Sequence, residues 1–394
     1  MKPSATSSVL RNINRSAVLE IIRQQGVISY SQIAHHLNVS FPTVMRIVEE
    51  LIQLNFVRPL GFSQEPNVGR PRSLIEFNGG GYCVIGLDLG GLELSGAIID
   101  LSGNIQAEVR SPVTKGDAQA NMTTMFNIID QLISIPRPAD QKILGIGIGA
   151  PGVTQFKEGV VTWAPNLGWS DMPLKTLVQD KFEISTFVEN DVNIATLAEL
   201  SFGAGRGKQN FVCLYLREGL GAGIVIAGML FRGHDAAAGE VGYLPPGLQY
   251  LGVTDKGFGI LEKFASSRGI VNRGKRMLKE NGQKRINLTI QQIIDAASQG
   301  EVWAKEIIDE TGRYLAFAVA CMTSVLNPEV ICLGGGVIEN VDGLITSITK
   351  NVEGGVPYMP KIVASPLGKN AVILGTVNLV LAEEMDFTML KTFV

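Results

Sequence analysis

The chain has 394 residues, 45% hydrophobic and 18% charged, a composition typical of two or three soluble globular domains. Its formal net charge of −3 does not by itself indicate a nucleic-acid-binding protein. The charge is uneven, however, because residues 1–78 carry eight Lys/Arg and five Asp/Glu, a net +3, and the remainder carries −6. A basic head on an acidic body favours a DNA-binding module fused to a small-ligand domain.

The sequence offers neither a metal centre nor a membrane anchor. Its four cysteines have no spacing typical of a metal site or a disulfide framework, and only three histidines accompany them. Scattered free thiols are typical of a reducing compartment. The first eight residues contain no apolar signal segment, and no apolar run reaches the ~18 residues that a membrane-spanning helix needs. We therefore expect a cytoplasmic protein with no membrane partner.

Three segments differ in pattern along the chain. Residues 9–58 have helical periodicity, and residues 59–82 are rich in Gly, Pro and Arg, as in a hairpin and linker. From Cys83 onward, apolar runs alternate with glycine turns and amphipathic helices. This last pattern predicts an α/β fold.

The helical segment is predicted to be a helix-turn-helix. Its elements are a first helix ending near Gly26, a short second helix Ser31–Leu37 opened by a serine cap, a turn at 38–40 and a third helix Phe41–Leu51. The apolar residues spaced to bury one face are Ile33, Ala34, Leu37, Val39, Val44, Ile47, Val48 and Leu51. Ser40, Phe41, Thr43 and Arg46 then point outward from the half of the third helix that contacts base edges in a major groove.

A wing is predicted after the third helix. A strand begins at Val57, Ser73–Phe77 returns as its partner, and residues 64–72 form the wing between them. Its Arg70-Pro71-Arg72 segment is extended and cationic, which suits a narrow minor groove or a row of phosphates. The alternative is a three-helix packing unit without DNA, but the N-terminal position, the small-residue turn and the basic wing together favour DNA binding.

The α/β segment contains a series of glycine-rich turns at the ends of predicted strands. In chain order they are Val84–Gly91 with Asp88 at the strand end, Ile143–Gly149, Trp163–Trp169, Val188–Asn193, Leu220–Ile224, Ala238–Gly242 and Ile331–Val337. Each is weak alone, but in this order and spacing the chain resembles the ROK family of repressors, open reading frames and sugar kinases over residues 12–382. The resemblance implies a winged helix-turn-helix at 1–78 and a two-lobed actin-like ATPase/sugar-kinase fold, with lobes at 79–192 and 193–394 and the C-terminal helix packing back on the first lobe.

The resemblance also implies a sugar site. Asn166 matches the sugar-contacting Asn of the family, Asn190-Asp191 match its Glu-Asn-Asp motif, and Glu240 and Glu262 match two further conserved acids. Asp191 stands where the kinases have the base that deprotonates the sugar hydroxyl. Convergent carboxylates and amides suit a polyol, because each pairs with several hydroxyls. Tyr243 replaces the family's His and is included as a sugar contact.

On the nucleotide side the chain departs from the family pattern. The residues that match the nucleotide turns, which we interpret as vestigial, are Asp88, Gly90, Gly91, Gly219, Gly221, Gly334 and Gly335. Leu92 stands where a phosphate-binding Thr is expected, and an apolar side chain cannot hydrogen-bond a phosphate. Glu218 replaces the Thr of the second phosphate loop and repels a triphosphate unless Arg217 neutralises it, in which case the pair fills the space. We therefore expect no bound ATP and no kinase activity, with Asp191 retained as a hydroxyl acceptor.

The family's zinc cluster is also missing. Val253, Asp255 and Ile260 stand where its cysteines are expected, so we predict no zinc and no other metal. The loop 244–259 must then be held by packing, for which Tyr250, Leu251 and Phe258 are the candidates.

Three functions are compatible with this pattern. The favoured one is a regulator, a repressor more than an activator, that binds duplex operator DNA as a homodimer or homotetramer and responds to a sugar. The second is an ATP-dependent sugar kinase with an accessory DNA-binding head. The third is a DNA-binding protein whose body serves only for dimerisation. The identity of the sugar, the operator sequence, the sign of regulation and the order of the oligomer are left open by the sequence.

Overall fold

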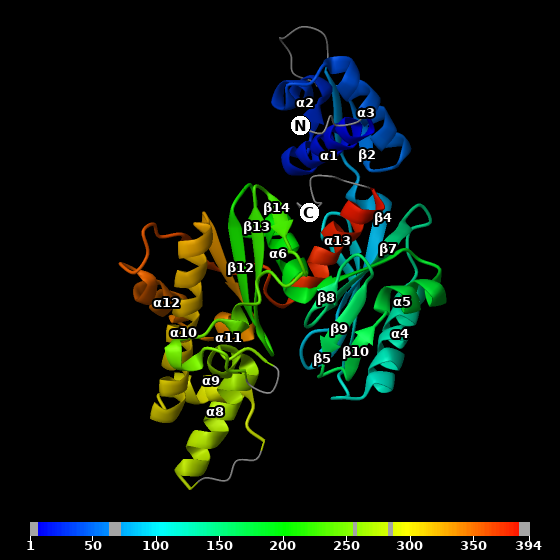
Figure 1. The fold of residues 1–394 in the computed structure, drawn as a ribbon. Coiled ribbons are helices and arrows are strands. Elements are labelled where there is room, and N and C mark those ends of the chain that lie inside the picture. The colour runs from blue at the N-terminus through cyan, green and yellow to red at the C-terminus, as the bar shows by residue number, and fades with distance from the viewer. Residues whose placement is uncertain (1–6, 63–71, 255–257, 283–286, 386–394) are drawn as a thin grey trace.

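The computed structural model describes residues 7–62, 72–254, 258–282 and 287–385 and shows a small head on a two-lobed body (Figure 1). The elements of the head are α1 (Ser7–Gln25), β1 (Ile28–Ser29), α2 (Tyr30–Leu37), α3 (Phe41–Gln53), β2 (Val57–Phe62) and β3 (Ser73–Phe77). The three strands pair in the order β1-β3-β2, so a small antiparallel sheet closes the three helices. The predicted winged helix-turn-helix is confirmed, and its strongest apolar positions, among them Ile33, Val44 and Leu51, are fully buried.

The start of α2 differs from the prediction. The capping serine is Ser29 and not Ser31, and the helix begins at Tyr30. The Ser29 hydroxyl accepts from the Gln32 amide at 3.3 Å, and the Gln32 side chain accepts from the Ser29 amide at 2.9 Å. This reciprocal pair needs a three-residue spacing, which only Ser29 has to Gln32.

The first lobe is a five-stranded mixed sheet between helices. Its elements are η1 (Gly79–Gly81), β4 (Tyr82–Asp88), β5 (Glu93–Asp100), β6 (Ile105–Pro112), α4 (Ala118–Ser134), β7 (Lys142–Ala150), β8 (Thr154–Gln155), β9 (Val160–Ala164), β10 (Trp169–Met172), α5 (Leu174–Phe182) and β11 (Thr186–Asn190). The sheet order is β11-β7-β4-β5-β6, parallel from β11 to β4 and antiparallel from β4 to β6. Parallel strands place their carboxyl ends at one edge, so Asp88, Ala150 and Asn190 end side by side.

The second lobe repeats this plan. Its elements are α6 (Asp191–Phe202), β12 (Phe211–Leu216), β13 (Leu220–Ile226), β14 (Met229–Phe231), η2 (Val241–Tyr243), η3 (Leu248–Tyr250), α7 (Glu262–Ala265), α8 (Ser267–Glu280), α9 (Ile290–Ser298), α10 (Val302–Leu326), β15 (Val330–Gly334), α11 (Gly336–Asn340), α12 (Leu344–Val352), β16 (Lys361–Ala364), η4 (Gly368–Asn370) and α13 (Ala371–Glu384). Its sheet order is β14-β13-β12-β15-β16.

Two helices, α6 and α13, lie between the sheets (Figure 1). Ile194 of α6 packs with the second sheet, and Val377 of α13 shares a core with Val84 and Ala97 of the first. The two helices approach so closely that a Cβ at Gly375 would lie 2.0 Å from the Ile194 carbonyl oxygen, which explains the glycine there. The hinge between the lobes is therefore a tightly packed helix pair.

The loop that replaces the zinc cluster is held partly as predicted. Tyr250 packs against Phe264 with 5.7 Å between ring centroids, and the Arg268 guanidinium lies 3.6 Å from the centroid of the Phe258 ring. Leu251 was also expected to pack here, but its side chain is 62% exposed. Among the described helices, none has the length and apolarity needed to cross a bilayer.

Candidate functional site

The cleft between the lobes contains two adjacent cavities. The larger, about 450 Å³, lies beside Asp88, and the smaller, about 120 Å³, lies beside Asp191. Five of the six predicted sugar contacts line the smaller cavity, namely Asn166, Asn190, Asp191, Glu240 and Glu262. Tyr243 lies outside that lining with half of its surface exposed, and its sugar contact stays a prediction.

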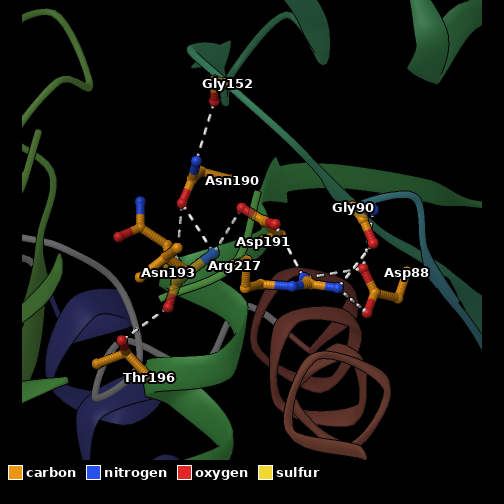
Figure 2. Close-up of polar contacts among 9 residues, drawn as sticks. Asp88, Gly90, Gly152, Asn190, Asp191, Asn193, Thr196 and Arg217 are labelled. Atoms are coloured by element: carbon orange, nitrogen blue, oxygen red, sulfur yellow. Dashed lines mark hydrogen bonds and ion pairs between the residues drawn. The ribbon is translucent and has the colours of Figure 1, made fainter. Parts of the chain in front are cut away.

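Arg217 lines both cavities, and Figure 2 shows its side chain beside those of Asp88 and Asp191. Arg217 Nη2 donates to Asp88 Oδ2 and to the Gly90 carbonyl, both at 2.8 Å. Its Nη1 donates to Asp191 Oδ2 at 2.9 Å and to Asp88 Oδ1 at 3.1 Å. The aspartates are nearly buried, and the guanidinium is their charge-assisted partner. Arg217 therefore ties β4 of the first lobe to β12 of the second.

This arrangement decides a point that the sequence left open. Arg217 could have paired with its neighbour Glu218, but it is directed at Asp88 and Asp191. Glu218 lines both cavities instead, and Leu92, 74% exposed, lines the larger one. Glu218 thus contributes a carboxylate at the position that the resemblance assigns to the second phosphate loop, and Arg217 engages the two acids that it assigns to metal-phosphate binding and proton transfer.

The turn that carries Asn190 and Asp191 is built as a helix cap. Asn190 Oδ1 accepts from the amides of Val192 at 2.9 Å and Asn193 at 3.1 Å, which caps α6, and its Nδ2 donates to the Gly152 carbonyl at 2.9 Å. The cap fixes Asp191 in the first turn of α6, with its side chain facing the cleft. Asn190 therefore lines the cavity while its amide group positions Asp191.

A buried ion pair supports the same turn. Arg232 Nε donates to Glu189 Oε2 at 2.5 Å, and Glu189 Oε1 accepts from the Asn190 amide at 2.8 Å and from Asn193 Nδ2 at 3.0 Å. This pair could not be predicted from the sequence, because its members lie 43 positions apart.

Burial and neighbouring acids raise the pKa of two carboxyl groups in the smaller cavity. Burial first, and then the charges of Glu262 and Asp191, raise the pKa of Glu240 to about 7. Burial raises the pKa of Asp191 to about 6, with the positive charge of Arg217 opposing it. Glu262 Oε2 accepts from Arg268 at 3.3 Å, and its Oε1 accepts from the Leu220 amide at 3.4 Å. The cavity thus presents acids that can accept from hydroxyls and, near neutral pH, also donate to them.

Five of the predicted glycines line the cavities. Gly90 and Gly91 line both, Gly335 lines the larger one, and Gly219 and Gly221 line the smaller. Gly334 is outside both linings, and its lack of a side chain makes room for the Tyr215 ring, 2.5 Å from where a Cβ would stand. Tyr215 itself lines both cavities and was not identified from the sequence.

Three of the residues predicted to contact DNA from the third helix are exposed on the head. Ser40, Phe41 and Arg46 are exposed and Thr43 is half-buried, with the Ser40 and Thr43 hydroxyls 2.8 Å apart at the start of α3. Arg72 is exposed at the base of the wing, whereas Arg70 and most of the wing lie outside the described residues.

Comparison with known proteins identifies the family. The chain matches the ROK family over residues 84–383 and a winged helix-turn-helix DNA-binding family over residues 11–58. The chain belongs to the ROK family. It is 29% identical to the xylose repressor of Caldicellulosiruptor bescii, covering 96% of this chain and 98% of that protein. It is 32% identical to the glucokinase of Halalkalibacterium halodurans, covering 68% and 84%.

A solved structure has the same overall fold as this ROK protein. It is the crystal structure of a ROK family transcriptional regulator, a homologue of the Escherichia coli MLC protein, with a TM-score of 0.79 and 24% identity. The alignment covers 96% of this chain and 98% of that one, so head and body are both shared.

The part of the chain that the structure describes contains no arrangement that suits zinc or a magnesium-nucleotide. Among the described residues, no group of three or more His, Cys, Asp and Glu is placed to hold a metal. Val253 and Ile260 carry no ligand atoms, and Asp255 lies outside the described residues. The acids Asp88 and Asp191 already share the Arg217 guanidinium.

Proposed function

We propose that this ROK protein is a sugar-responsive transcriptional repressor, whose head binds duplex operator DNA and whose smaller cavity binds the sugar. The observation that carries the proposal is Arg217, which lines both cavities and donates to Asp88 and Asp191, the two acids that the resemblance assigns to kinase chemistry. The named functions of the repressor relative and of the solved regulator support the same assignment. Both align along the head as well as the body.

The smaller cavity has the chemistry of a polyol site. Asp191, Glu240 and Glu262 provide acceptors from three elements of the chain, and Asn166 adds an amide from the turn after β9. Such convergent groups orient a sugar through several hydroxyls at once. The raised pKa values let the same acids donate to ring or hydroxyl oxygens.

The kinase alternative rests on the glucokinase relative, which aligns over the body. Phosphoryl transfer depends on cations and donors arranged around the transferring group and on a free base. Here Asp191 is hydrogen-bonded to Arg217, and Glu218 adds a negative charge to the phosphate side. We therefore propose that the body neither uses ATP nor requires zinc.

Regulation follows from geometry if the protein acts in the cytoplasm as a homodimer or homotetramer. Two heads must span half-sites about one helical turn, or ~34 Å, apart, so a shift of a few ångströms between heads weakens binding. A sugar that binds one arrangement of the lobes better than another shifts the equilibrium between the two arrangements. The difference between its two affinities sets the size of the shift.

The test combines two measurements on the full chain. Calorimetry with D-xylose, D-glucose and N-acetyl-D-glucosamine detects sugar binding, and the Asp191→Asn variant identifies the site. Fluorescence anisotropy with a 30-base-pair duplex, selected by the wild-type protein from a random pool, detects DNA binding. We expect binding of at least one sugar, lost in D191N, and weaker duplex binding with that sugar present.

Each alternative predicts a different result. Sugar-dependent ADP release from magnesium-ATP that disappears in D191N favours the kinase. Tight duplex binding with no heat from any sugar favours a body that serves only for dimerisation.

A further inference from the structure

The head is docked on the body through α1, the helix on the side of the head that faces the body (Figure 1). Apolar residues of α1, among them Leu19 and Ile22, belong to the same buried core as Val377 and Leu381 of α13. Tyr82 at the start of β4 stacks on Phe56 of the head, with 5.0 Å between ring centroids, and its hydroxyl donates to the Leu54 carbonyl at 3.1 Å. The contact is therefore a continuous core and not a flexible tether.

Arg23 is a charged residue enclosed in this contact. Its side chain is only 10% exposed, and its guanidinium lies 5.6 Å from the ring centroid of Phe77 and 5.8 Å from that of Phe202. Nη2 donates to Asn378 Oδ1 at 3.4 Å, and Nη1 donates to Glu20 at 3.5 Å. Phe77 ends β3, the strand that returns from the wing, whereas Phe202 ends α6 and Asn378 belongs to α13. Arg23 thus touches both body helices and the wing sheet.

Arg15 makes a second link of the same kind. Its Nη2 donates to the carbonyl of Met385, which caps α13, at 2.6 Å, and its Nη1 donates to Glu50 of α3 at 3.0 Å. One arginine therefore joins the end of α13 to the helix that presents Phe41 and Arg46. A single arginine side chain thus links each DNA-binding element of the head to the body helices. Arg23 links β3, and Arg15 links α3.

Of the two hinge helices, α6 begins at the smaller cavity and α13 begins at the larger one. Asp191 occupies the first turn of α6, and Phe202 is the last residue of this helix, which is about 18 Å long. Asn378 donates to the Leu197 carbonyl at 3.0 Å and so fastens α13 to the middle of α6. A change in the position of Asp191 on sugar binding moves the surface on which Arg23 rests.

We propose that α6 and α13 transmit sugar binding to the DNA-binding head, and that Arg23 is the positioning residue that couples them to the wing and α3. This inference rests on the proposed function and names the route of its regulation. Arg23 contacts neither sugar nor DNA in this scheme. Its substitution alters the coupling between the two ligands and leaves each separate affinity in place.

The test uses the Arg23→Met variant of the full chain. Methionine keeps much of the length of the arginine side chain and its apolar contacts with Phe77 and Phe202. It removes the positive charge and introduces no new buried charge. Phe202→Leu provides a second variant that alters the body side of the same contact. Arg11→Met is the matched control, because Arg11 lies on the same helix but pairs with Glu50 within the head.

The quantity measured is the ratio of duplex dissociation constants with and without saturating sugar, using the selected 30-base-pair duplex and whichever of D-xylose, D-glucose or N-acetyl-D-glucosamine binds by calorimetry. We expect a ratio of about 10 or more in the wild type and R11M, and about 2 or less in R23M and F202L, with sugar affinity unchanged in all four proteins.

Two other outcomes are decisive. A wild-type ratio retained in R23M and F202L overturns the coupling route and leaves the sugar-responsive regulator standing. A wild-type ratio of 1 with every sugar that binds overturns the regulator itself, and the coupling route with it.

Discussion

Replacing Arg217 with methionine removes the cation that two nearly buried carboxylates share. Arg217 donates four hydrogen bonds, at 2.8–3.1 Å, to Asp88, Asp191 and the Gly90 carbonyl. The side chains of the two aspartates are 7% and 9% exposed, and that of Arg217 is 23% exposed. Leaving one member of a buried pair alone costs about 3–5 kcal/mol. Because water reaches part of the guanidinium, we expect the lower end, about 3 kcal/mol of unfolding free energy at pH 8.

The loss of unfolding free energy in R217M must depend on pH. This dependence distinguishes a lost charge interaction from lost packing. Without Arg217 the two carboxylates repel each other, so the folded-state pKa of at least one rises further above its unfolded value. A raised folded pKa gives stability that is present at low pH and lost as the pH rises through that pKa. The penalty of R217M should therefore be small at pH 5 and full at pH 8. Adding Asp191→Asn should recover most of it.

The assay is urea unfolding followed by the fluorescence of the chain's three tryptophans, at pH 5 and pH 8. Arg206→Met is the control, since Arg206 is exposed on the loop after α6 and its loss should change stability by less than about 0.5 kcal/mol. If R217M matches R206M at pH 8, the guanidinium is not the partner of these acids and the reasoning about the cleft is wrong.

Three further predictions concern DNA, pH and metal. Arg46→Ala should weaken binding of the selected duplex by about 1–3 kcal/mol in an anisotropy titration without altering sugar binding, and unchanged duplex affinity would remove Arg46 from the interface. For Glu240→Gln, the pKa of about 7 against an ordinary 4.5 means that the wild type loses stability as the pH rises through 7. Thermal unfolding should therefore show E240Q gaining about 2–3 kcal/mol over the wild type between pH 4 and pH 8, and a pH-independent difference would contradict this assignment. Treatment with EDTA should leave the melting temperature unchanged, and a drop reversed by zinc would show a metal site that we propose is absent.

Much of the fold could be predicted from patterns that are local in the sequence. The helix-turn-helix could be predicted because its apolar spacing and turn residues are local in sequence, and Ile33, Val44 and Leu51 are buried as the spacing requires. The choice between Ser29 and Ser31 as the cap needed the partner, Gln32, to be taken into account. Leu251 was expected to fill the loop core because it is apolar, but loop packing depends on tertiary neighbours, and the space is used by Tyr250 and Phe258.

The residues of the site could be predicted from the sequence, but the contacts between them could not. Asp191, Glu240 and Glu262 could be placed together because the resemblance to the ROK family assigns all three to its sugar site. The partner of Arg217 could not be predicted, because Asp88 lies 129 positions away and the adjacent Glu218 is the nearer charge in sequence. The contacts of Arg23 could not be predicted from the sequence, because Asn378 and Phe202 come close to it only when the head packs on the body.

The central claim is that sugar alone, without a nucleotide, controls the affinity of the head for DNA. The most direct measurement is the duplex dissociation constant of the full chain at saturating sugar, with and without magnesium-ATP, while ADP is assayed in the same sample. Our account predicts at least about tenfold weaker duplex binding with sugar, the same value with magnesium-ATP present, and no ADP. Duplex affinity that changes only when magnesium-ATP is added, or ADP formed in proportion to sugar, would contradict it.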